Sequence, residues 1–251
     1  MVELVETTFK EILMKSQTLN LLKKELVLGN TLQSLIWMIC CFGMYFIPSY
    51  PSYVGPFYIT LCIMMTFALN QSSHDILYTV LLPVRKIDTV KARFLYCGLI
   101  ELISLVLAVI PALIRIFASF PQNQAGINTS IAYFGLQLIV YSIFNLIFLG
   151  NVYKNPLKPG LRYMAAAIAY FAAYALCELP VWIYYGNKGK LAEGTISELP
   201  KLAQVGQMFT DISGQFLKSQ CFILLAGILI FGGVWYLTFA RAARQFEKYD
   251  L

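Results

Sequence analysis

The sequence predicts an all-α integral membrane protein, on two observations. Hydrophobic residues make up 59% of the chain and charged residues 13%, with a mean hydropathy of +0.67, whereas soluble domains run at about 25% charged. The apolar runs approach the roughly 20 residues that a helix needs to cross a bilayer. They lack the two-residue alternation of barrel strands, so we expect helices.

Six apolar segments are expected to span the membrane and to form one transmembrane domain over residues 1–251. They are residues 31–47, 56–70, 95–117, 131–150, 162–185 and 219–240. The second segment is short but contains no charge.

Residues 1–30 are expected to form an amphipathic helix at the membrane interface, an elbow before the first span. Its apolar residues recur at roughly helical spacing and its polar side carries Lys10, Gln17 and Lys24, a pattern that favours the membrane surface. An ordinary solvated helix is the alternative. Gly29-Asn30 is a helix stop signal.

Charge distribution predicts the orientation. Six spans place both termini on one side, and most basic residues fall there: Lys10, Lys15, Lys23, Lys24, Arg85, Lys86, Lys91, Arg93, Lys154, Lys158, Arg162, Arg241, Arg244 and Lys248. Only Arg115, Lys188, Lys190, Lys201 and Lys218 fall in or near the other half. The positive-inside rule therefore predicts cytoplasmic termini. The net charge of +6 is explained by topology, and we expect no nucleic-acid partner.

The polar segment 71–94 separates the second and third predicted spans. Ser72 to Asp75 fits a capping box with Asp in place of Glu, and Pro83 fits the first turn of a new helix. These signals predict a helix–break–helix elbow that displays its basic residues, Arg85, Lys86, Lys91 and Arg93. A plain basic loop is the alternative, and local physics does not separate the two.

The longest outer connection covers residues 186–218. Apolar residues recur within it at three- and four-residue spacing, namely Ile196, Leu199, Leu202, Val205, Met208 and Phe209. This spacing predicts a short helix on the outer surface. Its role could be gating, contact with extracellular material or covering of the helix ends.

Catalytic and metal motifs are missing from the sequence. The single histidine, His74, excludes sites that need two histidine ligands. No GxxxxGK[ST] phosphate-binding loop occurs, since Gly186 to Lys190 has the wrong spacing. We therefore expect no metal or cofactor in this chain and no ATP hydrolysis by it alone.

Three charged residues fall inside predicted spans, where charge is costly and often functional. They are Glu101, Arg115 and Glu178. One hypothesis pairs Glu178 with Arg115 across the bundle. These groups could also stabilise helix packing, reach toward an interface or line a substrate path.

The stretch LLPVRKIDTVKARFLY resembles the SLPVSRKxIVxSKYL signature of the permease subunits of type-2 ABC exporters. The matching residues are Leu82, Pro83, Val84, Arg85, Lys86, Val90, Lys91 and Tyr96. One residue is missing relative to the usual PVSR wording, and Ala92-Arg93 departs from KY. The topology is most similar to small six-span permeases of Gram-positive bacteria that export, or confer immunity to, amphipathic peptides.

The resemblance implies a mechanism and partners. Such permeases lie among lipids in the bacterial cytoplasmic membrane and dimerise, here as a homodimer. Each copy binds a separate ATPase subunit that holds ATP and Mg. The coupling residues would be Asp75, Ile76, Leu77, Pro83, Val84, Arg85 and Lys86, with Arg85 and Lys86 facing acidic groups of the ATPase. The substrate would be amphipathic, with a peptide as the narrower expectation.

Two rival functions stay open on the sequence. One is a secondary transporter driven by an ion gradient, with Glu101 and Glu178 as proton carriers; inverted repeats would support it, and no convincing internal symmetry is visible. The other is a membrane partner protein that transports nothing.

Overall fold

The computed structural model describes residues 17–29, 31–118 and 121–248, and these ranges contain helices and no strand. The helix Gln17–Gly29 comes first. It is followed by α2 (Leu32–Met44), α3 (Val54–Ser72), α4 (Asp75–Leu81), α5 (Lys86–Phe117), α6 (Ile131–Ile147), α7 (Leu149–Val152), α8 (Pro159–Ala192), α9 (Lys201–Thr210) and α10 (Leu217–Glu247). The all-α prediction is confirmed.

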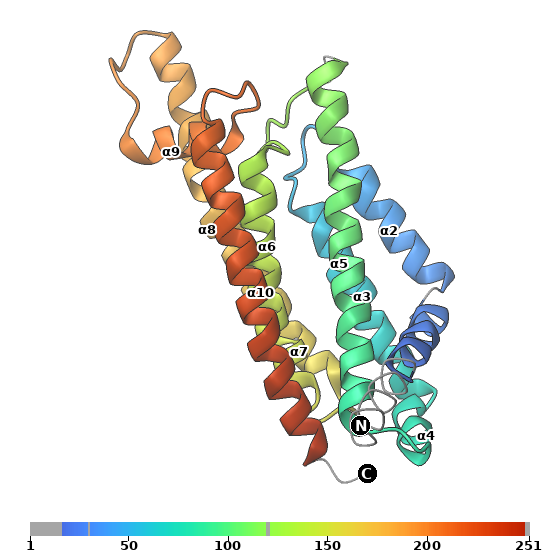
Figure 1. Ribbon diagram of the computed structural model, residues 1–251. Coiled ribbons are helices and arrows are strands. Elements are labelled where there is room, and N and C mark those ends of the chain that lie inside the picture. The colour runs from blue at the N-terminus through green and yellow to red at the C-terminus, as the bar shows by residue number, and fades with distance from the viewer. Residues whose placement is uncertain (1–16, 30, 119–120, 249–251) are drawn as a thin grey trace, which may run out of the picture.

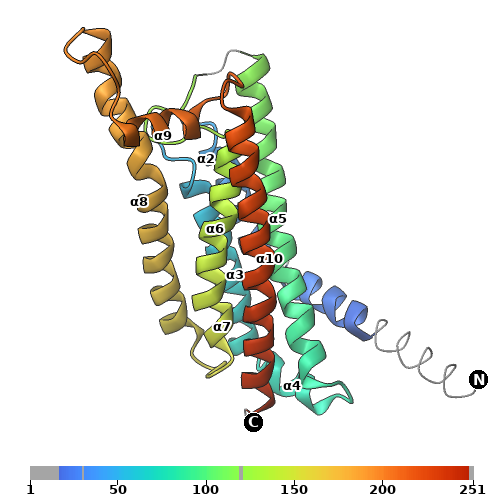
Figure 2. The same ribbon diagram turned by 60° about the vertical axis from the view of Figure 1, so that its left-hand side comes forward.

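The long helices run side by side as an elongated bundle (Figures 1 and 2). Helix Gln17–Gly29, α4 and the C-terminal end of α10 lie at one end, which we call the α4 end. Helix α9 lies at the opposite end, which we call the α9 end. The predicted elbow segments and the longest predicted loop are therefore at opposite ends of the molecule.

Five helices are long and apolar enough to cross a membrane: Val54–Ser72, Lys86–Phe117, Ile131–Val152, Pro159–Ala192 and Leu217–Glu247. The first predicted span differs. Helix α2 has 13 residues, about 20 Å of helix, against a hydrocarbon core of about 30 Å. It meets Gln17–Gly29 at 80°, and only this bent pair together qualifies as a sixth span. The expected interfacial helix thus lies within the described chain only from Gln17; residues 1–16 and Asn30 lie outside it.

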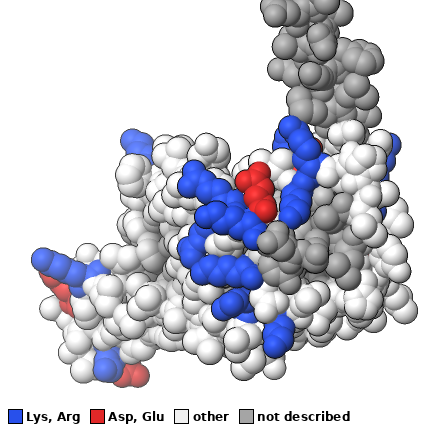
Figure 3. Space-filling view, turned by 90° about the horizontal axis from the view of Figure 1, so that it is seen from below, with Lys and Arg blue, Asp and Glu red and all other residues white. Residues whose placement is uncertain are grey.

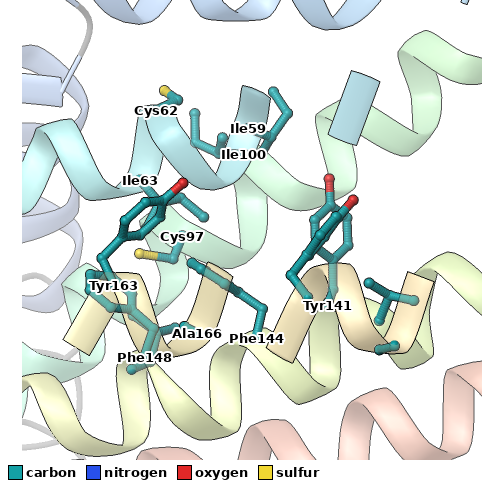
Figure 4. Close-up of a cluster of buried hydrophobic side chains, with 14 of the residues drawn as sticks. Ile59, Cys62, Ile63, Cys97, Ile100, Tyr141, Phe144, Phe148, Tyr163 and Ala166 are labelled. Atoms are coloured by element: carbon teal, nitrogen blue, oxygen red, sulfur yellow. The ribbon is translucent and has the colours of Figure 1, made fainter. Parts of the chain in front are cut away.

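Helix α6 forms the centre of the bundle. It is the most deeply buried of the spans and packs on α8 and α10, whereas α10 is the most exposed. Figure 4 shows aromatic residues Tyr141 and Phe144 of α6 beside Ile59 and Ile63 of α3 and Ile100 of α5. Apolar packing on α6 therefore holds together helices that are distant in sequence.

Two glycines allow α6 and α10 to approach closely. A Cβ at Gly135 would lie 2.6 Å from the Ile223 carbonyl oxygen, and a Cβ at Gly227 would collide with the Gly135 carbonyl oxygen. Backbone contact of this kind is typical of membrane helix pairs that use small residues. It fixes the position of α10 against the central helix.

Residues 186–218 contain the helix α9, and the non-helical connection is shorter than expected. Helix α8 continues past Gly186 to Ala192, so the non-helical part begins later. Helix α9 packs against α8, where a Cβ at Gly206 would collide with the backbone carbonyl of Pro180. It therefore covers the α9 end of the bundle.

The glycine contact generates a prediction. Gly227→Ala should destabilise the protein by about 1–3 kcal/mol, because the added methyl overpacks two backbones. Gly232→Ala is the matched control, since a Cβ there has no neighbour within 4 Å. Thermal unfolding midpoints of the purified variants would check this. Equal midpoints for both variants would show that α6 and α10 are not in this close contact.

Candidate functional site

The α4 end carries the helix–break–helix elbow expected from the sequence, with α4 and α5 separated by residues 82–85. The capping-box prediction is wrong. The hydroxyls of Ser72 and Ser73 each donate to the Leu69 carbonyl at 2.9 Å, so they close α3 instead of opening α4. The residue before α4 is His74, which has a φ of 53° and makes no side-chain cap.

Helix α5 begins later than predicted, at Lys86, so Pro83 lies in the break and not in a first helical turn. The proline ring holds the preceding Leu82 in an extended conformation. Arg85 precedes α5, and its Nε and Nη2 donate to Asp88 Oδ2 and Oδ1 at 2.7 and 3.1 Å. Hydrogen bonds to Asp88 and its negative charge raise the pKa of Arg85. This pair closes the first turn of α5.

Four charged residues from three elements meet behind the elbow. Arg93 of α5 donates from Nε and Nη2 to the two carboxylate oxygens of Glu25 at 3.1 and 3.0 Å. Its Nη2 also lies 3.2 Å from Asp75 Oδ2 in α4. Lys24 Nζ lies 2.8 Å from Asp75 Oδ1 and donates to Thr79 at 2.6 Å. We call Lys24, Glu25, Asp75 and Arg93 the charge cluster.

Burial makes the charge cluster a strong connection. Arg93 is 1% exposed, and its guanidinium lies 5.3 Å from the centre of the Phe67 ring of α3. The prediction that Arg93 is displayed is therefore wrong; it points inward because two carboxylates match its fork-shaped donors. Two acids and two bases balance the charge. The cluster thus fixes helix Gln17–Gly29, α4 and α5 to one another.

The tip of the elbow, which we define as Tyr78, Leu81 and Leu82, is apolar and exposed. Tyr78, Leu81 and Leu82 are 68%, 82% and 53% exposed, and Arg85 is exposed beside them. Of the other predicted coupling residues, Val84 and Lys86 are half-buried and Pro83 is exposed. The side chains of Ile76 and Leu77 lie outside the described part. Asp75 is paired with Lys24 and Arg93 inside the charge cluster, so it is a positioning residue for α4.

Basic residues gather on the face of the α4 end (Figure 3). They come from Gln17–Gly29, the start of α5, the connection before α8 and the end of α10, namely Lys23, Arg85, Lys86, Lys91, Lys154, Lys158, Arg241, Arg244 and Lys248. The α9 end instead mixes Lys188, Lys190, Lys201 and Lys218 with Glu193, Glu198 and Asp211. The two ends therefore differ in charge.

The three charged residues inside the predicted spans are all buried, but the hypothesised pair is wrong. No ion pair within 4.0 Å joins Arg115 to Glu178, both of which lie in the described chain. Arg115 Nη2 donates to the Tyr45 carbonyl at 2.6 Å, and Glu178 accepts from the Ile127 N–H at 2.9 Å. Each group uses backbone partners near the α9 end. Glu101 lies deeper, where Asn145 donates to it.

A groove of about 330 Å³ lies between α5, α6 and α10 near the α9 end. Its walls are mainly apolar and include Val109, Leu113 and Ile116 of α5 and Phe134 of α6. Polar groups of Asp211 and Gln220 also border it. The groove therefore offers an apolar interior with polar groups at its edge.

Comparison with known protein families assigns the chain to one family. The family model for ABC-2 family transporter proteins matches residues 20–205, which include the charge cluster and the elbow. The chain belongs to this family. It is a multi-pass membrane protein and the membrane subunit of an ABC transporter, not itself a catalytic ATPase. No curated protein and no solved structure matches it.

The sequence did not indicate the partners of the buried charges Arg93 and Glu101. Glu25 was only one of several charges in an amphipathic segment, and Asn145 was a polar residue in an apolar span. Glu25 is 68 residues from Arg93, and Asn145 is 44 residues from Glu101. A buried charge in α5 implies a partner, but local pattern cannot say which residue supplies it.

The charge cluster generates a prediction. Arg93→Ala should lower stability by about 3–5 kcal/mol, because it leaves the buried Glu25 without its two short hydrogen bonds and with only Lys24, 3.8 Å away, as a counter-ion. Arg244→Ala is the control, since it removes the same charge from an exposed position at the same end. Thermal unfolding of the purified variants would test this. An Arg93→Ala midpoint equal to that of Arg244→Ala would contradict the assigned role.

Proposed function

We propose that the chain is the permease half of an exporter that moves an amphipathic substrate with ATP and Mg bound by a separate ATPase subunit. The observation that carries the proposal is the elbow. Its exposed apolar tip is attached through the charge cluster to α5, which runs the length of the bundle. A force applied at α4 would therefore reach the membrane-spanning helices.

The α4 end faces the cytoplasm in this proposal, and both chain termini lie there. The gathering of basic residues at that end supports this orientation through the positive-inside rule. The membrane is the bacterial cytoplasmic membrane. There the apolar faces of α5 and α10, which include Leu102, Val106, Phe222 and Leu229, meet lipid or a second copy of the chain in a homodimer.

The ATPase subunit docks on the elbow tip. Tyr78, Leu81 and Leu82 supply exposed apolar surface, and buried aromatic or aliphatic anchors carry most of the binding energy in protein interfaces. Arg85 lies beside them, with Asp88 holding its position. Arg85 and Lys86 face acidic groups of the ATPase subunit.

Docking generates a prediction. Leu81→Glu should abolish co-purification with a co-expressed ABC ATPase subunit, because a charge replaces an interface anchor. Leu202→Glu is the matched control, since Leu202 is an exposed leucine of α9 at the other end. Affinity purification followed by ATPase assay would measure both. Retention of the complex by Leu81→Glu, or its equal loss in Leu202→Glu, would refute the docking site.

The groove between α5, α6 and α10 supports an amphipathic substrate. An apolar interior with polar edge groups suits a molecule with an apolar and a polar side, and a peptide of this character is the narrower proposal. The groove borders α5, the helix that begins at the elbow. Motion of α5 would therefore change its width.

The groove generates a prediction. Leu113→Trp should reduce stimulation of the complex's ATPase activity by amphipathic peptides about tenfold, because overfilling an apolar site costs about 1–3 kcal/mol. Leu176→Trp is the control, since Leu176 is an exposed leucine of α8 outside the groove. Equal stimulation of the two variants would exclude the groove as the substrate site.

A further inference from the structure

A polar seam joins α5 to α6 deep in the bundle. Ser104 Oγ of α5 and Tyr141 Oη of α6 lie 2.7 Å apart, and Asn145 Nδ2 of α6 donates to Glu101 Oε2 at 2.9 Å. Glu101 and Asn145 are each 0% exposed. The two pairs are one helical turn apart and link helices that otherwise meet other neighbours, α5 packing on α2, α3 and α10.

The hydrogen bonding of the Glu101–Asn145 pair is incomplete. Glu101 Oε1 and Asn145 Oδ1 both lack a hydrogen-bond partner within the described residues. An ionised carboxylate and an amide oxygen can only accept hydrogen bonds. If Glu101 were ionised, Glu101 Oε1 and Asn145 Oδ1 would therefore both lack a donor. Leaving buried acceptors unsatisfied is unfavourable.

Among the residues that the structure describes, no cation forms an ion pair with Glu101. Helices α2, α3 and α6 contain no charged residue, and α10 carries its charges near its ends. The titratable groups that interact with Glu101 are Cys97 of α5, Tyr141 of α6 and Tyr170 of α8. None of these supplies a positive charge, and an uncompensated carboxylate in the bundle interior would cost several kcal/mol.

Arg93 is the nearest basic residue on the same helix, but it is already occupied. It lies eight residues before Glu101, about 12 Å along the helix axis, and is paired with Glu25 and Asp75. The surroundings of Glu101 therefore favour its neutral form on geometry alone.

We propose that Glu101 is a proton-binding site, held as the neutral carboxylic acid whose Oε1 proton is donated to Asn145 Oδ1. The proton supplies the donor that both unpartnered oxygens lack. With the Asn145 amide already donating to Oε2, the two side chains form a cyclic pair with two hydrogen bonds. The bound proton thereby clamps α5 to α6.

The clamp differs from a proton carrier. A carrier must release its proton to an aqueous side in each cycle, whereas Glu101 is fully buried and its proton is held between two helices. The proton is held by one residue of α5 and one of α6, so its binding does not depend on the ATPase partner or on the substrate.

Infrared difference spectroscopy of the purified full-length protein at neutral pH tests the proposal. The wild-type minus Glu101→Gln spectrum should show loss of a protonated-acid carbonyl band. Loss of the carboxylate stretching bands instead would overturn the proposal. Glu101→Gln should unfold close to the wild-type midpoint, because the glutamine amide can donate in place of the acid. Ser104→Ala is the control, since it removes the neighbouring hydrogen bond and should leave the acid band in place.

A second variant keeps the test decisive if Glu101→Gln does not fold. Asn145→Leu removes the acceptor, so the acid band should remain but move to higher frequency, and the unfolding midpoint should fall by about 5 °C. An Asn145→Leu spectrum with an unshifted acid band, or with carboxylate bands only, would show that Glu101 does not donate to Asn145.

Discussion

The arrangement of the α4 end depends on one constraint: a buried guanidinium needs carboxylate partners. Arg93 is held in the interior by Glu25 and Asp75, which come from two other elements. Removing either carboxylate would leave charge unbalanced in an apolar setting. The constraint therefore fixes helix Gln17–Gly29 and α4 relative to α5, together with the apolar packing of Leu22 and Leu26 on the buried core.

This constraint explains how a small elbow could act on a whole bundle. Helix α4 is short and its tip is exposed, so packing alone would hold it weakly. The charge cluster attaches it to α5, and α5 in turn borders the groove near the α9 end. The polar seam at Ser104 and Glu101 lies between these two regions. One long helix thus connects the proposed docking surface, the proton site and the proposed substrate groove.

Composition and local pattern predicted where the helices lie better than they predicted which residues make contact. Continuous apolar runs predicted five spans that form long helices, whereas local pattern left the elbow as one of two alternatives. The capping box was wrong because Ser72 and Ser73 bond backward to Leu69, an equally good local choice. Arg93 looked like a surface charge because its partner Glu25 is 68 residues away. Only tertiary placement shows that the two meet, and the same holds for Glu101 and Asn145.

Because the charge cluster joins them, helix Gln17–Gly29, α4 and α5 should move together as one unit. Spin labels at Leu28 and Tyr78, both exposed, would report the distance within this unit in the complex with the ATPase subunit. Labels at Tyr78 and Leu161, exposed at the start of α8, would report the distance to the rest of the bundle. Trapping with a nucleotide analogue should shift the second distance and leave the first unchanged. A shift in the first distance as large as that in the second would show that these helices do not move as one unit.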